Sequence, residues 1–243
     1  MKEALASRTG SALMWRALQQ AGVQSIYLLR TLILARLLLP EHFGLVAIAT
    51  TTVGLALNVS NLGMVPALVQ RQEAQLHHYD TAWTVGLLRG LLITGGIALA
   101  APWVATAFGA PEATNIIRAL SLRPLFEALA SIQIARLTRD LRFRSLAGIR
   151  VPPALVDLTI ASLLARTLGV WAMVAGTLAG ALTVIVLSYL IAPHRPRLRV
   201  DRNAANSLIR FGRWIFVRGL LTVAGGALIQ LVISRNMGVA ALG

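Results

Sequence analysis

Residues 170–202 read VWAMVAGTLAGALTVIVLSYLIAPHRPRLRVDR, in which 23 residues without a charge (170–192) precede four arginines within eight positions. About 20 apolar residues allow a helix to cross the ~30 Å hydrocarbon core of a bilayer. Six further apolar runs of similar length lie in the chain: 15–36, 46–69, 84–106, 115–135, 151–169 and 214–235. The pattern predicts an all-α membrane protein, a polytopic bundle of transmembrane helices.

The basic residues are distributed unevenly between the two sides that these runs would define. Fifteen of the 23 Lys and Arg residues fall in every second gap, and three fall in the opposite gaps. The fifteen are Lys2, Arg8, Arg16, Arg71, Arg136, Arg139, Arg142, Arg144, Arg150, Arg195, Arg197, Arg199, Arg202, Arg210 and Arg213; the three are Arg36, Arg166 and Arg235. Because Lys and Arg are retained on the cytoplasmic side during insertion, this bias predicts a cytoplasmic N-terminus.

Composition excludes several other classes of protein. The formal net charge of +14 is spread over separate short gaps and forms no aromatic-interleaved basic patch, so nucleic-acid binding is not expected. The chain has no cysteine, which excludes disulfides and thiolate metal sites. No glycine-rich phosphate loop and no Ser/His/acid set can be assembled. We therefore expect no catalytic residues, no metal and no cofactor.

An internal repeat indicates how the chain is organised. Three residues return at a constant offset of 199 positions: Trp15, Arg36 and Gly44 correspond to Trp214, Arg235 and Gly243. Six spans separate the two copies, so the repeats would have the same orientation, as the two halves of many transporters do. The sequence therefore predicts a six-helix lobe (1–193), a basic cytoplasmic loop (194–213) and the first helix of a second, truncated lobe (214–243).

Several motifs in chain order carry a resemblance to a known transporter family. They are LARLLLPEHFGLVA (34–47), NLGMVPALVQR (61–71), LTRDLRF (137–143), GVWAMV (169–174), RPR (195–197) and FGRW (211–214). Together they resemble the Wzx-type polysaccharide and O-antigen flippases of the multidrug/oligosaccharidyl-lipid/polysaccharide exporter superfamily. Such proteins often carry an acidic residue in the seventh helix. This chain has Gln230 there, so ion coupling at that helix is not expected.

Seven charged residues fall inside the apolar runs, where a charge is costly unless it faces a partner or a water-filled space. They are Arg30, Arg89, Arg118, Arg123, Glu127, Asp157 and Arg218. Arg118 and Arg218 lie close enough to the ends of their runs for the side chains to reach the interface. Arg30 lies deeper, and it either reaches the interface or lines a cavity.

The remaining charges suggest an anion-binding cavity. Arg123 and Glu127 share a helix face because they are four residues apart. They either neutralise each other or leave Arg123 for a ligand, and Pro124 between them is expected to bend the helix. Asp157 either pairs with Arg89 or Arg123, or titrates as an ion-coupling group.

The guanidinium fork matches the geometry of phosphate. We therefore predict substrate binding by Arg89, Arg123 and Arg30, and ion coupling or charge pairing by Glu127 and Asp157.

The resemblance implies flipping of a lipid-linked oligosaccharide, a polyprenyl-pyrophosphate glycan, across the bacterial inner membrane by alternating access. The implied partners are this substrate, membrane lipids, and polysaccharide polymerase or assembly proteins. One alternative is a drug-type ion-coupled antiporter of the same superfamily, which would favour acidic residues where this chain has arginines. Another is a membrane-embedded glycan polymerase or ligase, for which the outward gaps are too short to build a catalytic site.

Overall fold

The computed structural model describes residues 2–60, 66, 68–69, 76–193, 196–198 and 201, and these residues form helices and no strand. The helices are α1 (Lys2–Leu37), α2 (Pro40–Val59), α4 (Leu76–Ala107), α5 (Ala113–Leu120), α6 (Leu122–Leu129), α7 (Ile134–Arg139), α8 (Phe143–Leu168) and α9 (Val170–Ile191). The predicted loop at 194–213 falls almost wholly outside the described residues, and the helix predicted within 214–243 falls outside them completely.

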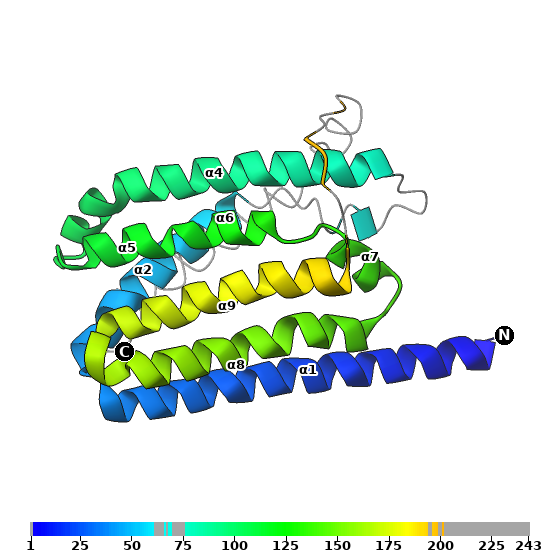
Figure 1. Cartoon of the computed structure of the whole chain (residues 1–243), viewed down its shortest axis with the longest axis horizontal. Coiled ribbons are helices and arrows are strands. Elements are labelled where there is room, and N and C mark those ends of the chain that lie inside the picture. The colour runs from blue at the N-terminus through cyan, green and yellow to red at the C-terminus, as the bar shows by residue number, and fades with distance from the viewer. Residues whose placement is uncertain are drawn as a thin grey trace, which may run out of the picture.

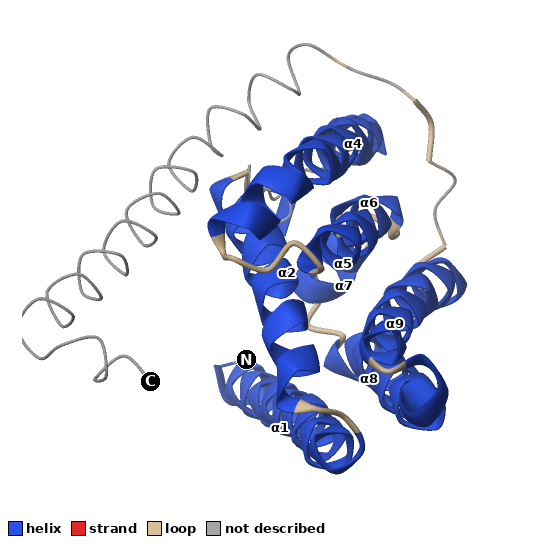
Figure 2. Ribbon diagram, turned by 90° about the vertical axis from the view of Figure 1, so that its left-hand side faces the viewer, coloured by secondary structure: helices blue, strands red, loops and turns tan. Residues whose placement is uncertain are grey.

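The long helices run side by side, and helices that are consecutive in the chain run in opposite directions. In Figure 1, α4, the α5–α6 pair, α9, α8 and α1 succeed one another from top to bottom, and α2 crosses them at an angle. Seen end-on in Figure 2, α2 lies between α4 and α1. The most extensive contacts are those of α8 with α9 and of α1 with α8. The described part of the chain therefore crosses the bundle six times, with α5 and α6 together making one crossing.

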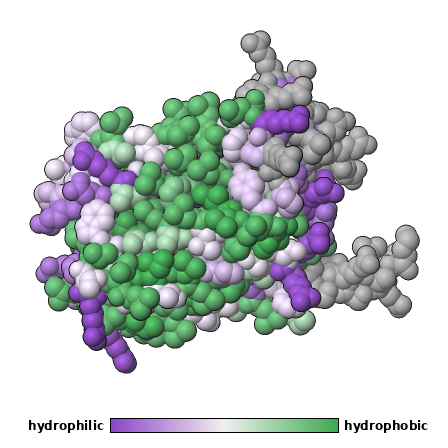
Figure 3. Space-filling view, viewed as in Figure 1, coloured by the Kyte–Doolittle hydropathy of each residue, from purple (hydrophilic) through white to green (hydrophobic). Residues whose placement is uncertain are grey.

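Four of the described helices are long and apolar enough to cross a membrane: Pro40–Val59, His78–Ala107, Phe143–Leu168 and Val170–Ile191. Figure 3 shows apolar side chains over the middle of one face, with polar side chains gathered toward both ends. This belt is what a helix bundle presents to lipid. The prediction of an all-α polytopic membrane protein is confirmed.

The connections alternate between the two ends of the bundle. The N-terminus, the start of α4, α7 and the end of α9 lie at one end of Figure 1, which we call the basic end because α7 and the start of α8 bring their arginines there. The short turns between α1 and α2, α4 and α5, and α8 and α9 lie at the opposite end. Gly169 makes the last of these turns with φ of +55°, a conformation that side chains disfavour.

The main hydrophobic core closes the bundle at the end opposite the basic end. It includes Leu34 near the end of α1, Ala49 in the middle of α2, Ala101 in α4, Ile117 in α5 and Ala172 in α9. Two smaller clusters lie at the basic end, one around Phe143 and the other around Tyr79. The core therefore holds the helices together at one end, and the space between them lies toward the middle and the basic end.

The fourth apolar run differs from the single helix that 115–135 predicts. It forms α5 and α6, which are interrupted at Ser121. Pro124 has no N–H to donate to the carbonyl of Leu120, so the helix loses a hydrogen bond there. The Thr94 hydroxyl on α4 donates to the Ser121 carbonyl at 2.7 Å, which satisfies a polar group at the break. The bend expected from Pro124 is thus an interruption of the helix.

Two boundaries also differ from the predicted gaps. Residues 40–42, predicted as an outward loop, form the first turn of α2, where Pro40 fits because the missing N–H is not needed. Arg150, predicted as part of a basic cytoplasmic loop, lies in the second turn of α8, which begins at Phe143. The loops are therefore shorter, and the helices longer, than the apolar runs alone indicate.

Candidate functional site

Two neighbouring cavities lie between the helices, and each contains charged residues. The first, which we call the Arg89 cavity, has a volume of about 390 Å³ and is lined by parts of α2, α4, α6, α8 and α9. The second, the Arg30 cavity, has a volume of about 450 Å³ and is lined by parts of α1, α2, α6, α8 and α9. Glu127 and Val184 line both cavities, so the two spaces meet at these side chains.

An ion pair between α1 and α8 lies in the wall of the Arg30 cavity. The Arg30 Nε donates to the Asp157 Oδ1 at 2.8 Å, and the two side chains are only 12% and 7% exposed. The Arg30 Nη2 also donates to the Met173 carbonyl at 3.3 Å and to the Thr177 hydroxyl at 3.4 Å, both on α9. Arg30 therefore lines a cavity, which is one of the two positions that the sequence left open. Its guanidinium connects α1, α8 and α9.

Asp157 has a different partner from those that the sequence suggested. Pairing with Arg89 or Arg123 was one of the two alternatives for Asp157, the other being ion coupling, but the carboxylate pairs with Arg30, because α1 packs alongside α8. Charge pairing of Asp157 is thus observed, and the predicted partners are wrong.

The position of Asp157 depends on two glycines of α9. A Cβ added at Gly176 would lie 2.5 Å from Asp157 Oδ1 and 2.7 Å from the Asp157 carbonyl oxygen. A Cβ at Gly180 would lie 3.0 Å from the Pro153 carbonyl oxygen. Real Cβ atoms essentially never approach as closely as at Gly176 and rarely as closely as at Gly180, so glycine at position 176 lets α9 come this near to α8. Small residues on the facing helix allow close helix packing of this kind.

Arg123 and Glu127 form the pair that their spacing predicts. Their Nε and Oε1 atoms are 3.1 Å apart, one turn from each other on α6. The side chains are 46% and 48% exposed, so this pair is far more open than that of Arg30 and Asp157. An exposed pair of this kind contributes little to stability. Arg123 can therefore exchange its carboxylate partner for another anion at small cost.

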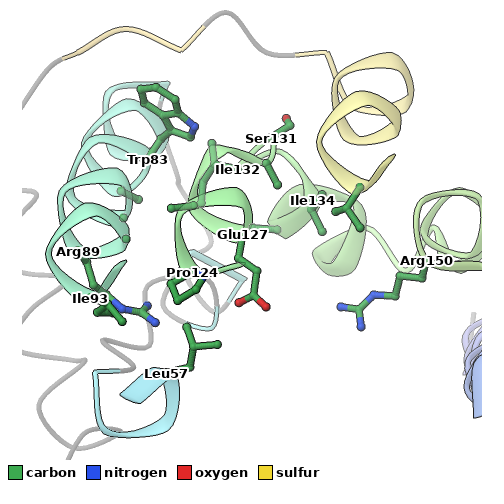
Figure 4. A pocket seen from close by; sticks show the side chains of 17 residues that line it. Leu57, Trp83, Arg89, Ile93, Pro124, Glu127, Ser131, Ile132, Ile134 and Arg150 are labelled. Carbon is green, nitrogen blue, oxygen red and sulfur yellow. The ribbon is translucent and has the colours of Figure 1, made fainter. Parts of the chain in front are cut away.

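Arg89 enters the first cavity from α4. Its Nε is buried and has no hydrogen-bond partner among the residues that the structure describes. The adjacent Gly90 brings α4 against α6, since a Cβ there would lie 2.7 Å from the Ala128 Cβ and 3.0 Å from the Pro124 carbonyl oxygen. Figure 4 shows Arg89 and Glu127 on neighbouring walls of this cavity, with Arg150 facing it from α8.

The structure thus brings all five candidate residues to the two connected cavities: Arg30, Arg89, Arg123, Glu127 and Asp157. Arg118 is exposed on α5 and lines neither of them, as its interfacial interpretation requires. Arg218 lies outside the described residues. No cluster of three or more metal-ligating side chains occurs in the described part of the chain.

Sequence reasoning missed several polar residues of these cavities, among them three that could contact a ligand. Tyr27 and Thr177 line the Arg30 cavity, and Arg150 lines the Arg89 cavity. A signal for Arg150 exists in the sequence, because it precedes Asp157 by seven residues, or two helical turns, and so shares its face of a helix. Because Arg150 was assigned to the cytoplasmic loop, its position on the same helix face as Asp157 was missed.

Comparison with known proteins gives a consistent set of relatives. Residues 33–243 match the family described as "Polysaccharide biosynthesis protein". The succinoglycan biosynthesis transport protein ExoT of Rhizobium meliloti is 27% identical over 94% of this chain and 47% of its own length. The lipopolysaccharide biosynthesis protein WzxC of Escherichia coli is 21% identical over 98% of this chain and 49% of its own. The chain therefore spans about half the length of these relatives, and no solved structure matches it.

Proposed function

Because the chain belongs to the polysaccharide biosynthesis protein family, we propose that it forms part of a transporter that flips a lipid-linked oligosaccharide across the bacterial inner membrane. Its relatives include a protein named for succinoglycan transport and one named for lipopolysaccharide biosynthesis. A glycan joined to a polyprenyl carrier through pyrophosphate is the substrate class that suits both the family and the charges of the cavities.

The observation that carries this proposal is the set of arginines around the two connected cavities. Four arginines (Arg30, Arg89, Arg123 and Arg150) and two carboxylates (Glu127 and Asp157) line them, which leaves an excess of two positive charges. Charges within an apolar bundle are costly and mark a ligand path or a partner. An excess of guanidinium groups favours phosphate over a cationic drug, which would require an excess of carboxylates.

The shape of the bundle indicates a direction. The hydrophobic core seals the end opposite the basic end, whereas the Arg89 cavity extends toward the basic end. If that end is cytoplasmic, as the distribution of Lys and Arg suggests, the head group reaches the cavities from the cytoplasm. The apolar carrier chain stays in lipid, where its burial needs no protein cavity. Alternating access then requires the core to open at the far end, against the second lobe that the sequence repeat predicts from residue 214 onward.

The carboxylates have a defined role in this scheme. Glu127 holds Arg123 while the cavity is empty and gives it up when a phosphate arrives, so that the Arg123 guanidinium has an anionic partner before and after binding. Asp157 pairs with Arg30 away from the Arg89 cavity and is the remaining candidate for ion coupling.

Export of glycan by the complete protein tests the proposal. In a strain that lacks its own flippase, the unmodified protein should restore surface glycan, and Arg89→Gln should remove most of that export. Loss of one charge-assisted hydrogen bond corresponds to about a 10- to 100-fold loss of affinity. Arg118→Gln, which changes an exposed arginine that lines neither cavity, is the matched control. A protein that inserts but restores no glycan would contradict the proposed function.

Arg123 is tested by a cycle in the same assay. If Arg123 binds substrate, both Arg123→Gln and the double variant Arg123→Gln/Glu127→Gln should lose export at matched protein level. Restoration of export in the double variant would show instead that Arg123 only neutralises Glu127, because removal of both partners leaves no unpaired charge.

A further inference from the structure

We propose that Arg89 and Arg150 form a receiving site for the phosphates of the lipid-linked substrate, separate from the Arg30 cavity and occupied before it. This inference rests on the proposed function and adds to it a binding residue, Arg150, and an order of binding. It follows from three observations: which arginines already have partners, where the two cavities lie along the bundle, and what separates them.

The first observation is the difference in partners among the four cavity arginines. Arg30 is held by Asp157, Met173 and Thr177, and Arg123 is held by Glu127. Arg89 and Arg150 form no ion pair with any carboxylate of the described residues. A phosphate that meets Arg89 and Arg150 therefore displaces no protein carboxylate, whereas one that meets Arg30 must displace Asp157.

The balance of charge follows the same division. In the Arg89 cavity, Arg89 and Arg150 face only Glu127, which leaves one positive charge in excess. In the Arg30 cavity, Arg30 and Arg123 are balanced by Glu127 and Asp157, which leaves none. Glu127 is also already bonded to Arg123. The electrostatic attraction for an arriving anion is consequently concentrated in the Arg89 cavity.

The second observation is the position of this cavity along the bundle. Arg150 lies seven residues from the start of α8, about 10 Å by helical rise, and that start is at the basic end. Ser131 and Ile134, at the junction of α6 and α7, line the same cavity. The Arg30 cavity is lined instead by Tyr27 and Arg30, in the half of α1 that approaches the opposite end. An anion coming from the basic end meets Arg150 first.

The third observation is the wall shared by the two cavities. Glu127 and Val184 line both spaces, and Figure 4 shows the Glu127 carboxylate between Arg89 and Arg150. Movement of a phosphate from the first cavity to the second therefore passes the Arg123–Glu127 pair. Arg123 would change partner from Glu127 to phosphate at this point, without any step that exposes an unpaired guanidinium.

Binding by the complete purified protein in detergent tests the receiving site. The probe is undecaprenyl pyrophosphate, and its dissociation constant is measured for the unmodified protein and for Arg150→Gln, Arg150→Lys and Arg144→Gln. Arg144 is the matched control, because it is also an exposed arginine of the first turns of α8 but lines neither cavity. Thermal unfolding of each variant is measured alongside, so that a loss of folding is recognised as such.

We expect Arg150→Gln to raise the dissociation constant about 10- to 100-fold. Arg144→Gln should leave it unchanged, and Arg150→Lys should fall between, since lysine keeps the charge but lacks the planar fork. Inorganic pyrophosphate should compete with the probe, because the phosphates are the recognised group. Phosphatidylglycerol should compete poorly, since its single phosphodiester has less charge.

Three results would overturn the receiving site. They are an unchanged dissociation constant for Arg150→Gln, an equal loss for Arg144→Gln, and equal competition by phosphatidylglycerol, which would identify Arg150 as a general lipid contact. None of these would affect the proposed function as long as the unmodified protein restores glycan export. Failure of the unmodified protein to restore export would instead contradict the proposed function itself.

Discussion

Arg30 and Asp157 are 127 residues apart in the chain, yet they form the most buried ion pair among the described residues. At 12% and 7% exposure, neither side chain has enough water around it to replace a lost partner. The contacts of Arg30 with α9 extend this pair into a connection between α1, α8 and α9. Arg30 therefore has a structural role, and its predicted role in binding substrate requires this connection to open.

A cycle of substitutions at this pair separates the two roles. Arg30→Gln and Asp157→Asn should each lower the temperature of unfolding of the complete protein in detergent, because each leaves one buried charge unpaired. Removal of one partner of a buried ion pair lowers the free energy of unfolding by about 3–5 kcal/mol. The double variant Arg30→Gln/Asp157→Asn should regain much of this stability, since it leaves no unpaired charge.

Arg36→Gln provides the control for that cycle, because Arg36 is an exposed residue in the last turn of the same helix. An unfolding temperature unchanged in both single variants would show that the pair does not join the helices. A double variant with full stability and no glycan export would assign Arg30 to the substrate as well.

The predictability of these residues depends on how far apart they are in the chain. The pairing of Arg123 with Glu127 follows from a spacing of four residues, which fixes a common helix face. The pairing of Arg30 with Asp157 depends on which helices are neighbours and on their relative height, and a single sequence contains neither. Arg150 was missed for another reason: an arginine near the end of an apolar run looks the same whether it anchors topology or faces a cavity.

The contact between α8 and α9 is the element on which the geometry of Asp157 depends. Gly176 and Gly180 are four residues apart on α9 and face Pro153 and Asp157 on α8. Close approach of this kind replaces the hydrophobic driving force that is absent between helices in lipid. Since Arg30 reaches both helices, any separation of α8 from α9 also alters the Arg30 cavity.

We expect Gly176→Ala to destabilise the complete protein by about 1–3 kcal/mol, the usual cost of forcing extra atoms into a packed contact. The added Cβ would meet backbone and carboxylate atoms of Asp157 that have little freedom to move. Gly95→Ala in α4 is the matched control, because nothing lies within 4 Å of a Cβ at that glycine. Alanine is the better helix former, so this control should be neutral or slightly stabilising.

Thermal unfolding in detergent measures both glycine variants. Equal unfolding temperatures for Gly176→Ala and Gly95→Ala would contradict the close contact between α8 and α9. The sequence alone does not distinguish Gly176 from Gly95, because both lie in apolar helices. The difference arises because α8 lies against Gly176, whereas no atom lies within 4 Å of a Cβ at Gly95.

At the scale of the whole molecule, the alternation of the connections was predictable, and the closure of the bundle was not. Apolar runs of about 20 residues separated by short gaps require consecutive helices to run in opposite directions, and the six crossings of the described residues follow from that. The concentration of the hydrophobic core at one end depends on many contacts between distant helices. The cavities are the spaces that this packing leaves unfilled, so they could be identified only from the structure.

The orientation of this closed end in the membrane is the last prediction. The gaps at the basic end carry most of the Lys and Arg residues, so we expect that end to be cytoplasmic and the sealed end to be periplasmic. Alkaline phosphatase is active only after export to the periplasm. A fusion after Glu112, in the turn between α4 and α5 at the sealed end, should therefore be active.

A fusion after Arg142, which directly precedes α8 at the basic end, should be inactive. The two fusion points are 30 residues apart, on either side of the α5–α6 crossing. If both fusion proteins are expressed equally, a difference in phosphatase activity therefore reports on which side of the membrane each fusion point lies. The reverse pattern of activity would place the cavities on the periplasmic side. A head group arriving from the cytoplasm would then meet the sealed core first, and the order of binding proposed for Arg150 and Arg89 would have to be reversed.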